Sequence, residues 1–142
     1  MVATANDISQ LPPELLRKGR LDEIFFVDLP SKQERAEIFR IHITKRGRNV
    51  DQFSFEPMAE GSKDFSGAEI EEAINSALYD AFYAQQQLTT NHVLTALAQT
   101  VPLAKTMDEQ INRLRSWAEG RARNASVPRD LQVGNTVRRM EL

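Results

Sequence analysis

The chain has 142 residues, of which 41% are hydrophobic and none is cysteine. This composition allows one ordinary domain with an apolar core, and it excludes disulfide bonds, thiolate metal sites and a cysteine nucleophile. The 18 basic and 20 acidic residues give a formal net charge of -2, so the chain as a whole does not attract nucleic acid or an anionic membrane. No apolar stretch approaches the roughly 20 residues of a membrane-spanning helix, and we expect a cytoplasmic protein without a membrane partner.

Two arginines, Arg17 and Arg20, lie three positions apart in the N-terminal stretch. An apolar segment follows them and predicts a strand over Glu23–Leu29. Because arginine keeps its charge and presents a planar fork of donors, such a pair is suited to binding phosphate oxygens. The alternative interpretation is a solvated basic loop, since Arg-x-x-Arg pairs are common on protein surfaces.

Four helices are predicted after this strand. Each begins at a serine or threonine that suits an N-cap, and two begin within capping boxes, Ser31 with Glu34 and Ser66 with Glu69. Apolar residues recur at helical spacing within each segment. The expected helices span about residues 31–46, 54–61, 66–82 and 90–98. The residues expected to face the core include Phe39, Ile43, Met58, Ile70, Ile74, Ala77, Leu78, Phe82, Val93 and Leu97.

The C-terminal part is expected to hold one more helix and a basic tail. Val101-Pro102-Leu103 interrupts the fourth helix, and the next begins at Thr106 or Met107 with an apolar stripe. The basic residues of this part are Arg121, Arg123, Arg129, Arg138 and Arg139. Acidic residues interrupt this charge, so we favour a solvated terminus, or one that docks on a neighbouring subunit, over contact with nucleic acid.

The N-terminal stretch closely resembles the second region of homology of AAA-type ATPases. The resemblance is carried by V-A-T-A-N, which ends at Asn6, and by L-P-P-E-L-L-R-K-G-R-L-D after it. In that family the asparagine is a sensor that helps to orient the γ-phosphate and the attacking water, and the two arginines project into the neighbouring subunit's nucleotide. The resemblance implies these roles for Asn6, Arg17 and Arg20, so hydrolysis would depend on assembly. Asp7 departs from the pattern, because many relatives have arginine there.

Two further segments resemble parts of the same family. Taken alone, His42 is a helix-surface histidine without a metal partner at ligand spacing. Ile41-His42-Ile43-Thr44 nevertheless matches a segment in which the histidine lies beside the adenine and ribose. The run F-S-G-A-E-I resembles the sensor-2 region, in which a glycine lets the backbone approach the purine. The resemblance therefore implies nucleotide contact by His42, Gly67 and Ala68, with Ala68 at a position where many AAA+ branches have an arginine.

The fold class that follows is mainly α. It is a four-helix AAA lid, preceded by the last one or two strands of the α/β ATPase core and followed by a C-terminal helix and tail. We expect the remnant of the core over residues 1–30, the lid over 31–100, and the helix and basic tail over 101–142. The run that begins V-P-L-A-K-T resembles the C-terminus of cyanobacterial and plastid AAA proteins known as hypothetical chloroplast reading-frame products, which makes the plastid stroma a second candidate location.

Two components of a P-loop ATPase are missing from the sequence. No G-x-x-x-x-G-K-[ST] motif occurs, and no apolar strand ends in paired acidic residues that could hold magnesium. The resemblance implies that both lie upstream, so Met1 is expected to mark a truncated frame. The resemblance implies that the parent protein binds ATP and magnesium, assembles with identical subunits into the ring that the family forms, and remodels an unknown protein substrate. This chain alone is expected to bind neither ligand tightly and to be inactive.

Two other classes of function are alternatives for this sequence. A stand-alone helical interaction module without ATPase activity would explain the missing P-loop, but it would have to cover the apolar strand over Glu23–Leu29. A metal-dependent or other hydrolytic enzyme is disfavoured, because His42 and His92 are widely separated and no nucleophile motif accompanies them. The acidic pair Glu71-Glu72 is interpreted as solvated.

Overall fold

The computed structural model describes residues 2–15, 17 and 23–126, and these form two compact units. Unit 2 is Leu29–Asn112, and unit 1 consists of the described residues before and after it. The chain therefore passes from unit 1 into unit 2 and then returns, which makes unit 2 an insertion in the sequence of unit 1. None of the helices in the described part of the chain combines the length and the apolar character needed to cross a bilayer.

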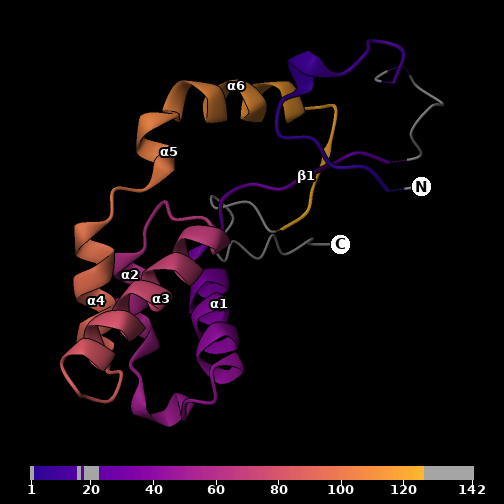
Figure 1. The fold of residues 1–142 in the computed structure, drawn as a ribbon. Coiled ribbons are helices and arrows are strands. Elements are labelled where there is room, and N and C mark those ends of the chain that lie inside the picture. Colours follow the sequence, from indigo (N-terminus) through magenta and orange to yellow (C-terminus); the bar gives the residue numbers. More distant parts are fainter. Residues whose placement is uncertain (1, 16, 18–22, 127–142) are drawn as a thin grey trace, which may run out of the picture. The chain divides into compact units, whose positions relative to one another are not determined.

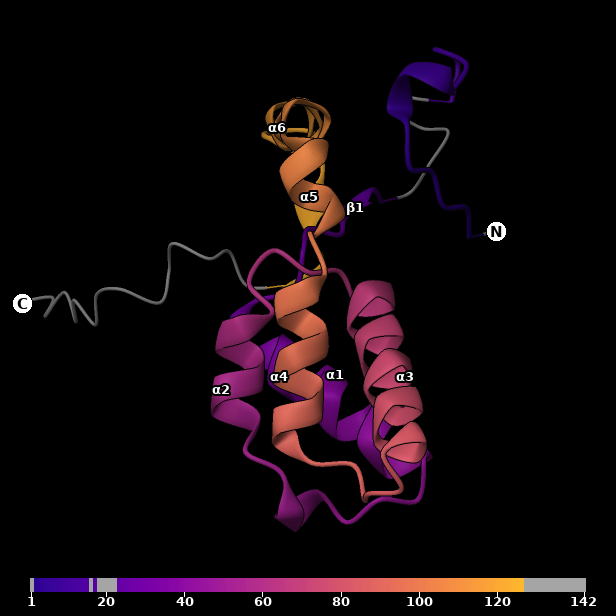
Figure 2. The same ribbon diagram turned by 60° about the vertical axis from the view of Figure 1, so that its left-hand side comes forward.

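Unit 2 is built around four helices (Figure 1). They are α1 (Lys32–Lys45), α2 (Phe55–Gly61), α3 (Gly67–Tyr83) and α4 (Thr90–Gln99), with a short 3-10 helix, η2 (Val50–Gln52), between α1 and α2. Helix α1 packs against α2 and α3, and α4 packs against the same two helices. Figure 2 shows α2, α4 and α3 side by side with α1 behind them. The arrangement encloses a single apolar core and agrees with the expected mainly α fold.

The starts of α1 and α3 are fixed by local hydrogen bonds. At α1 the Ser31 hydroxyl accepts from the backbone N–H of Glu34 at 3.3 Å, and the Glu34 carboxylate accepts from the backbone N–H of Ser31 at 2.7 Å. Ser66 and Glu69 form the same capping box at α3. Both boxes were predicted from the sequence and are confirmed. They satisfy backbone donors that the first turn of a helix leaves without an intrahelical partner.

Two other boundaries show how the chain turns between helices. Helix α1 ends before Gly47, whose φ of +67° lies in the left-handed region that favours glycine. Helix α4 begins one residue earlier than predicted, because Thr89 is the N-cap and the ring of His92 takes the place of the glutamate in the capping box. His92 Nδ1 accepts from the backbone N–H of Thr89 at 3.1 Å.

The core of unit 2 follows the predicted apolar stripes with one clear exception. The fully buried large side chains include Phe39, Ile43, Met58, Ile70, Ile74 and Val93. Phe82 was expected to face the same core, but 81% of its surface is exposed. It lies in the last turn of α3. Helical periodicity still places Phe82 on the apolar face there, but no core residues of the described chain lie opposite it. The prediction for Phe82 is therefore wrong.

The chain after α4 also differs from the prediction in detail. Instead of one helix from Thr106 or Met107, a short helix α5 (Leu103–Thr106) is followed by α6 (Asp108–Ala118). Met107 lies between the two and is exposed rather than buried. The residues of the tail beyond 126, including Arg129, Arg138 and Arg139, lie outside the described residues.

Unit 1 contains a short parallel sheet made from segments far apart in the sequence. Strand β1 (Phe25–Phe26) pairs with β2 (Arg123–Asn124), with Phe25 opposite Arg123 and Phe26 opposite Asn124. The backbone N–H of Arg123 donates to the carbonyl oxygen of Ile24 at 2.8 Å. The predicted strand over Glu23–Leu29 is present but shorter, because β2 offers backbone partners over only two residues. Unit 1 also contains η1 (Ile8–Gln10), a 3-10 helix.

Candidate functional site

The candidate site lies along the seam between α1 and α3, where side chains of the two helices meet in pairs. At the first level, a Cβ placed on Gly67 would lie 3.7 Å from Ile38 Cδ1. One turn further along both helices, Glu71 Oε1 lies 3.4 Å from His42 Nδ1. The residue numbers of the paired positions increase together on both helices, so α1 and α3 run in the same direction along this seam. His42 and Gly67, which were predicted from separate motifs, therefore lie on one seam.

The next level of the seam is a polar cluster around Arg46, the C-cap residue of α1. Its Nε donates to Asn75 Oδ1 at 3.2 Å, and its Nη2 also donates to that oxygen. Its Nη1 donates to the carbonyl oxygen of His42 at 3.1 Å and lies 3.2 Å from His42 Nδ1. Arg46 thus joins the end of α1 to the middle of α3 and contacts the predicted site histidine directly.

The seam partners of His42 were not predicted from the sequence. Glu71 was interpreted as solvated, but it is only half exposed and contacts both His42 and Arg46 at 3.4 Å. That interpretation is wrong, because it considered the surface of one helix without its neighbour. Arg46 was noted only as the approximate end of a helix, and Asn75 was not singled out. Arg46 and Asn75 are 29 positions apart, and the sequence pattern of neither helix indicates that they pair.

The first turn of α3 contains a capping box and two backbone N–H groups that donate to no described residue. The capping box uses the backbone N–H groups of Ser66 and Glu69. The N–H groups of Gly67 and Ala68 have no acceptor among the described residues. Such groups are the usual anion-binding donors of a helix N-terminus. Ala68 is exposed and Gly67 is partly exposed, so an outside acceptor can reach this turn.

Glu69 also ties this turn to the segment that follows α4. Its carboxylate accepts from the backbone N–H of Leu103 at 2.7 Å, in addition to the N–H and hydroxyl of Ser66, each at 2.8 Å. Burial acts to raise the pKa of Glu69, but the hydrogen bonds from Leu103 and Ser66 outweigh it and hold the pKa below its ordinary value. The carboxylate is therefore ionised at neutral pH and fixes two chain segments at the start of α3.

Gly67 is not required by packing within the described chain. The only contact that an added Cβ would make is the ordinary van der Waals contact with Ile38, and the φ of Gly67 does not lie in the left-handed region. Glycine at the first position of a long helix costs stability relative to alanine. A ligand or another part of the protein, outside the described residues, that approaches the backbone closely at this position would account for the glycine.

Two of the predicted catalytic residues, Asn6 and Arg17, belong to unit 1. Asn6 and Arg17 are exposed, and Arg20 lies outside the described residues. Asp7, which departs from the family pattern, caps η1 by accepting from the backbone N–H of Ser9 at 2.9 Å and from its hydroxyl at 2.6 Å. These hydrogen bonds from Ser9 lower the pKa of Asp7. Asp7 therefore has a local structural role.

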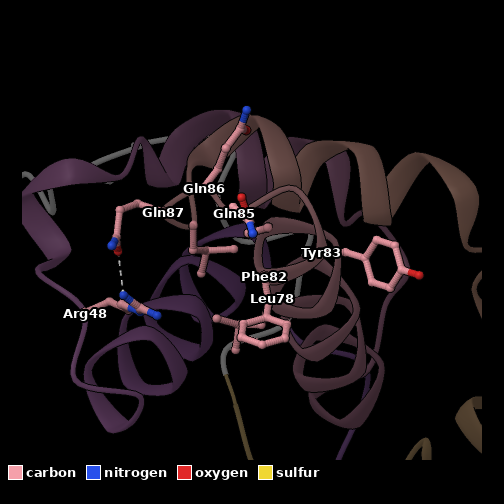
Figure 3. Close-up of a pocket in the computed structure, with 9 residues that line it drawn as sticks. Arg48, Leu78, Phe82, Tyr83, Gln85, Gln86 and Gln87 are labelled. Carbon is pink, nitrogen blue, oxygen red and sulfur yellow. Dashed lines mark hydrogen bonds between the residues drawn. The ribbon is translucent and has the colours of Figure 1, made fainter.

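Two further kinds of site are a metal cluster and a pocket. Within the described residues, no group of three or more histidine, cysteine or carboxylate side chains could hold a metal ion. A pocket of about 510 Å³ lies at the C-terminal end of α3, where Leu78, Phe82 and the glutamines of the following loop line it (Figure 3). Arg48 Nη1 donates to Gln87 Oε1 at 2.7 Å at its rim. Phe82 is roughly 20 Å along α3 from Gly67, so the pocket is separate from the first turn of α3.

A four-helix unit with these boundaries, linked in sequence to a short strand, is consistent with the helical subdomain of an AAA ATPase. Comparison with known proteins gives the same class. The AAA domain-containing protein ycf46 of Pyropia yezoensis is 49% identical over 129 residues, which cover 89% of this chain and 26% of that protein. The ycf46 protein of Trieres chinensis is 48% identical over 131 residues, with coverage of 91% and 26%.

A more distant relative supports the class. A proteasome-activating nucleotidase of Saccharolobus solfataricus is 35% identical over 98 residues, which cover 68% of this chain and 25% of that protein. No protein-family model matches the chain. The chain belongs to the AAA ATPases and is similar to their ycf46 proteins, as the motifs predicted. It spans about a quarter of the length of the curated relatives that it matches.

Proposed function

We propose that this chain is the helical lid and adjoining sensor segment of an oligomeric AAA ATPase, and that the longer protein hydrolyses ATP to remodel a macromolecular partner. The identity of nearly one half to AAA domain-containing proteins supports this proposal. The observation that carries it is the seam between α1 and α3, where His42 lies one turn from the open first turn of α3 at Gly67 and Ala68. A nucleotide base could contact both.

In this proposal, ATP with magnesium supplies the phosphoryl group, and residues outside this chain hold the metal and the triphosphate. Asn6 orients the terminal phosphate and the attacking water. Arg17 and Arg20 extend into a neighbouring subunit of the same kind and place positive charge against the developing negative oxygens. His42 and the backbone of Gly67 and Ala68 contact the base and ribose. Closure of the lid would therefore depend on nucleotide, and hydrolysis would depend on assembly.

The test uses a chimera in which this chain replaces the matching 129-residue segment of the Pyropia yezoensis relative. We expect the chimera to bind a fluorescent ATP analogue and to release phosphate from ATP. Arg17→Ala and Arg20→Ala should each reduce phosphate release at least about 100-fold while nucleotide binding is kept. His42→Ala should weaken nucleotide binding.

Arg40→Ala is the matched control, because Arg40 is an exposed arginine of α1 that stacks on Phe55. It should change neither binding nor hydrolysis. A chimera that folds but binds no nucleotide would overturn the proposed function and favour the stand-alone interaction module. If hydrolysis persists in both arginine variants, nucleotide binding stands and the finger roles of Arg17 and Arg20 are wrong.

A further inference from the structure

The two ring nitrogens of His42 have different surroundings. Nδ1 lies 3.2 Å from Arg46 Nη1 and 3.4 Å from Glu71 Oε1. Nε2 has no hydrogen-bond partner in the described part of the chain. Because no buried side-chain nitrogen or oxygen there lacks a partner, Nε2 must reach solvent, although only 18% of the His42 side chain is exposed. The seam thus occupies one nitrogen and leaves the other available.

The contact with Arg46 determines which nitrogen carries the proton. A guanidinium group is always charged and has donors but no acceptor, so Arg46 Nη1 must donate and His42 Nδ1 must accept through its lone pair. Glu71 approaches Nδ1 only as an ion-pair contact, and the same carboxylate oxygen accepts from Arg46 Nη2 at 3.4 Å. A lone pair on Nδ1 places the ring proton of neutral histidine on Nε2.

Hydrogen bonds fix the orientation of the Arg46 guanidinium that donates to His42 Nδ1. Its guanidinium plane is anchored to Asn75 Oδ1 through two nitrogens and to the backbone carbonyl of His42 through a third. Only 18% of its side chain is exposed. The planar fork cannot satisfy these acceptors and also turn away from Nδ1. Asn75 therefore orients Arg46, and Arg46 orients His42.

We propose that Arg46 is a positioning residue that directs the ring proton of neutral His42 to Nε2. The exposed nitrogen is then a hydrogen-bond donor, and it selects an acceptor atom of the nucleotide, a ring nitrogen of the base or an oxygen of the ribose, over an exocyclic amino group. The identity of the ligand rests on the proposed function, whereas the position of the proton is a property of this chain alone.

The position of the proton is measured by two-bond proton–nitrogen NMR correlation of the histidine rings in the 15N-labelled chain, at about pH 8 so that histidine is neutral. The chain has only two histidines, so a His92→Asn variant assigns both spectra. We expect Nδ1 of His42 to give the signal of an unprotonated nitrogen and Nε2 that of a protonated one. A wild-type spectrum with the proton on Nδ1 overturns the proposal without any variant.

Arg46→Met removes the donors while keeping an unbranched side chain. In this variant we expect His42 to lose its single form and to shift toward a proton on Nδ1, with Glu71 as the acceptor. Glu71→Gln keeps Arg46 and should leave the proton on Nε2. His92 is the internal control, because its Nδ1 accepts from the backbone N–H of Thr89 and should stay unprotonated in every variant. An unchanged His42 spectrum in folded Arg46→Met contradicts the positioning role.

Nucleotide affinity of the chimera then tests the ligand. Arg46→Met should weaken binding of the ATP analogue by about 5- to 10-fold, and the loss should not add to that of His42→Ala, because both remove the same donor. Additive losses would contradict a role through His42. A chimera that binds no nucleotide would overturn the proposed function, while the NMR spectra would still decide whether Arg46 fixes the proton.

Discussion

The buried guanidinium of Arg35 donates two hydrogen bonds to the carbonyl oxygen of Ala59, from Nε at 3.1 Å and from Nη2 at 2.9 Å. Ala59 lies in the last turn of α2, where carbonyl oxygens have no intrahelical partner. Nη1 of the same residue donates to the carbonyl oxygen of Pro30 at 2.8 Å. One positive charge on α1 therefore stabilises the C-terminal end of α2 and fixes the chain just before α1 begins.

Arg35→Met should lower the free energy of unfolding of unit 2 by about 3 kcal/mol, because it removes three charge-assisted hydrogen bonds and leaves the carbonyl oxygen of Ala59 with only the Ser62 hydroxyl as a donor, at 3.2 Å. Urea unfolding followed by circular dichroism measures this loss. Arg40→Met is the matched control on the same helix, since Arg40 is exposed and stacks over the ring of Phe55 at 4.5 Å. Its cost should stay within about 1 kcal/mol. Equal costs for the two variants would show that the buried hydrogen bonds of Arg35 do not stabilise the fold.

Glu69→Gln should destabilise unit 2 by about 1 kcal/mol at neutral pH, because an amide oxygen is a weaker acceptor for the N–H groups of Ser66 and Leu103. The pKa of Glu69 in the folded state lies below its ordinary value of 4.5. Its ionised form therefore contributes stability that is fully present above that pH and is lost as the pH falls through the folded-state pKa. The difference between the wild type and the variant should shrink in the same window.

Unfolding at a series of pH values measures this difference, with Glu72→Gln as the control. Glu72 is exposed, and no hydrogen bond or ion pair involves it within the described residues. Its substitution should have little effect at any pH. A cost of Glu69→Gln that stays constant down to acid pH would mean that the charge of Glu69 does not matter for the cap.

Gly67→Ala should raise the free energy of unfolding of this chain by up to about 1 kcal/mol, because alanine is favoured in a helix and the added methyl group meets only Ile38 at an ordinary distance. Gly47→Ala provides the contrast. Nothing lies within 4 Å of a Cβ at Gly47, but its φ is +67°, so the substitution should destabilise by about 1 kcal/mol. Thermal unfolding compares the two.

In the chimera, the same Gly67→Ala substitution should weaken nucleotide binding if a purine approaches the backbone of α3. A variant that is more stable but binds nucleotide less tightly would separate the ligand contact from folding. Unchanged binding would argue against nucleotide contact at Gly67.

Asp28→Asn should loosen unit 1 selectively. Arg115 donates to both carboxylate oxygens of Asp28, from Nε to Oδ2 at 3.0 Å and from Nη2 to Oδ1 at 2.9 Å, and each side chain is about one third exposed. We expect a loss of about 1 kcal/mol, since a paired, partly shielded geometry exceeds a typical surface ion pair. Trp117, the only tryptophan, lies in unit 1 and reports its unfolding by fluorescence.

The matched control for Asp28→Asn is Glu23→Gln. Glu23 Oε1 lies 2.8 Å from Arg123 Nη1, but the arginine is 71% exposed, so its removal should cost less than about 0.5 kcal/mol. The helical signal of unit 2 should be unchanged in both variants. A shift of the helical transition that equals the shift in fluorescence would show that the two units unfold as one.

The features that the sequence predicted well are local ones. The capping boxes at Ser31 and Ser66 join residues three positions apart, so the starts of α1 and α3 are visible in the chain itself. Apolar periodicity identified the buried faces, but it could not show where the core ends. For that reason it failed at Phe82, in the last turn of α3.

Long-range pairs could not be predicted from any single segment. The partner of β1 is a two-residue strand near the other end of the described chain, and nothing in the sequence of Arg123–Asn124 indicates a strand. The same reason explains the candidate site. His42, Gly67 and Ala68 came from a family resemblance, whereas Arg46, Glu71 and Asn75 become visible only when α1 and α3 lie side by side.

The parallel pairing of β1 with β2 has a consequence for the order in which the protein is made. Phe26 leaves the ribosome long before Asn124, and all of unit 2 lies between them. At roughly 5 to 20 residues per second, the intervening chain takes on the order of 5 to 20 s to synthesise. The sequence of every helix of unit 2 is synthesised within that time, while β1 still lacks its partner strand β2. Late in synthesis the nascent chain therefore holds the whole sequence of the helical bundle but only one strand of the sheet. A chaperone that binds extended apolar segments would meet Phe25 and Phe26 during this interval.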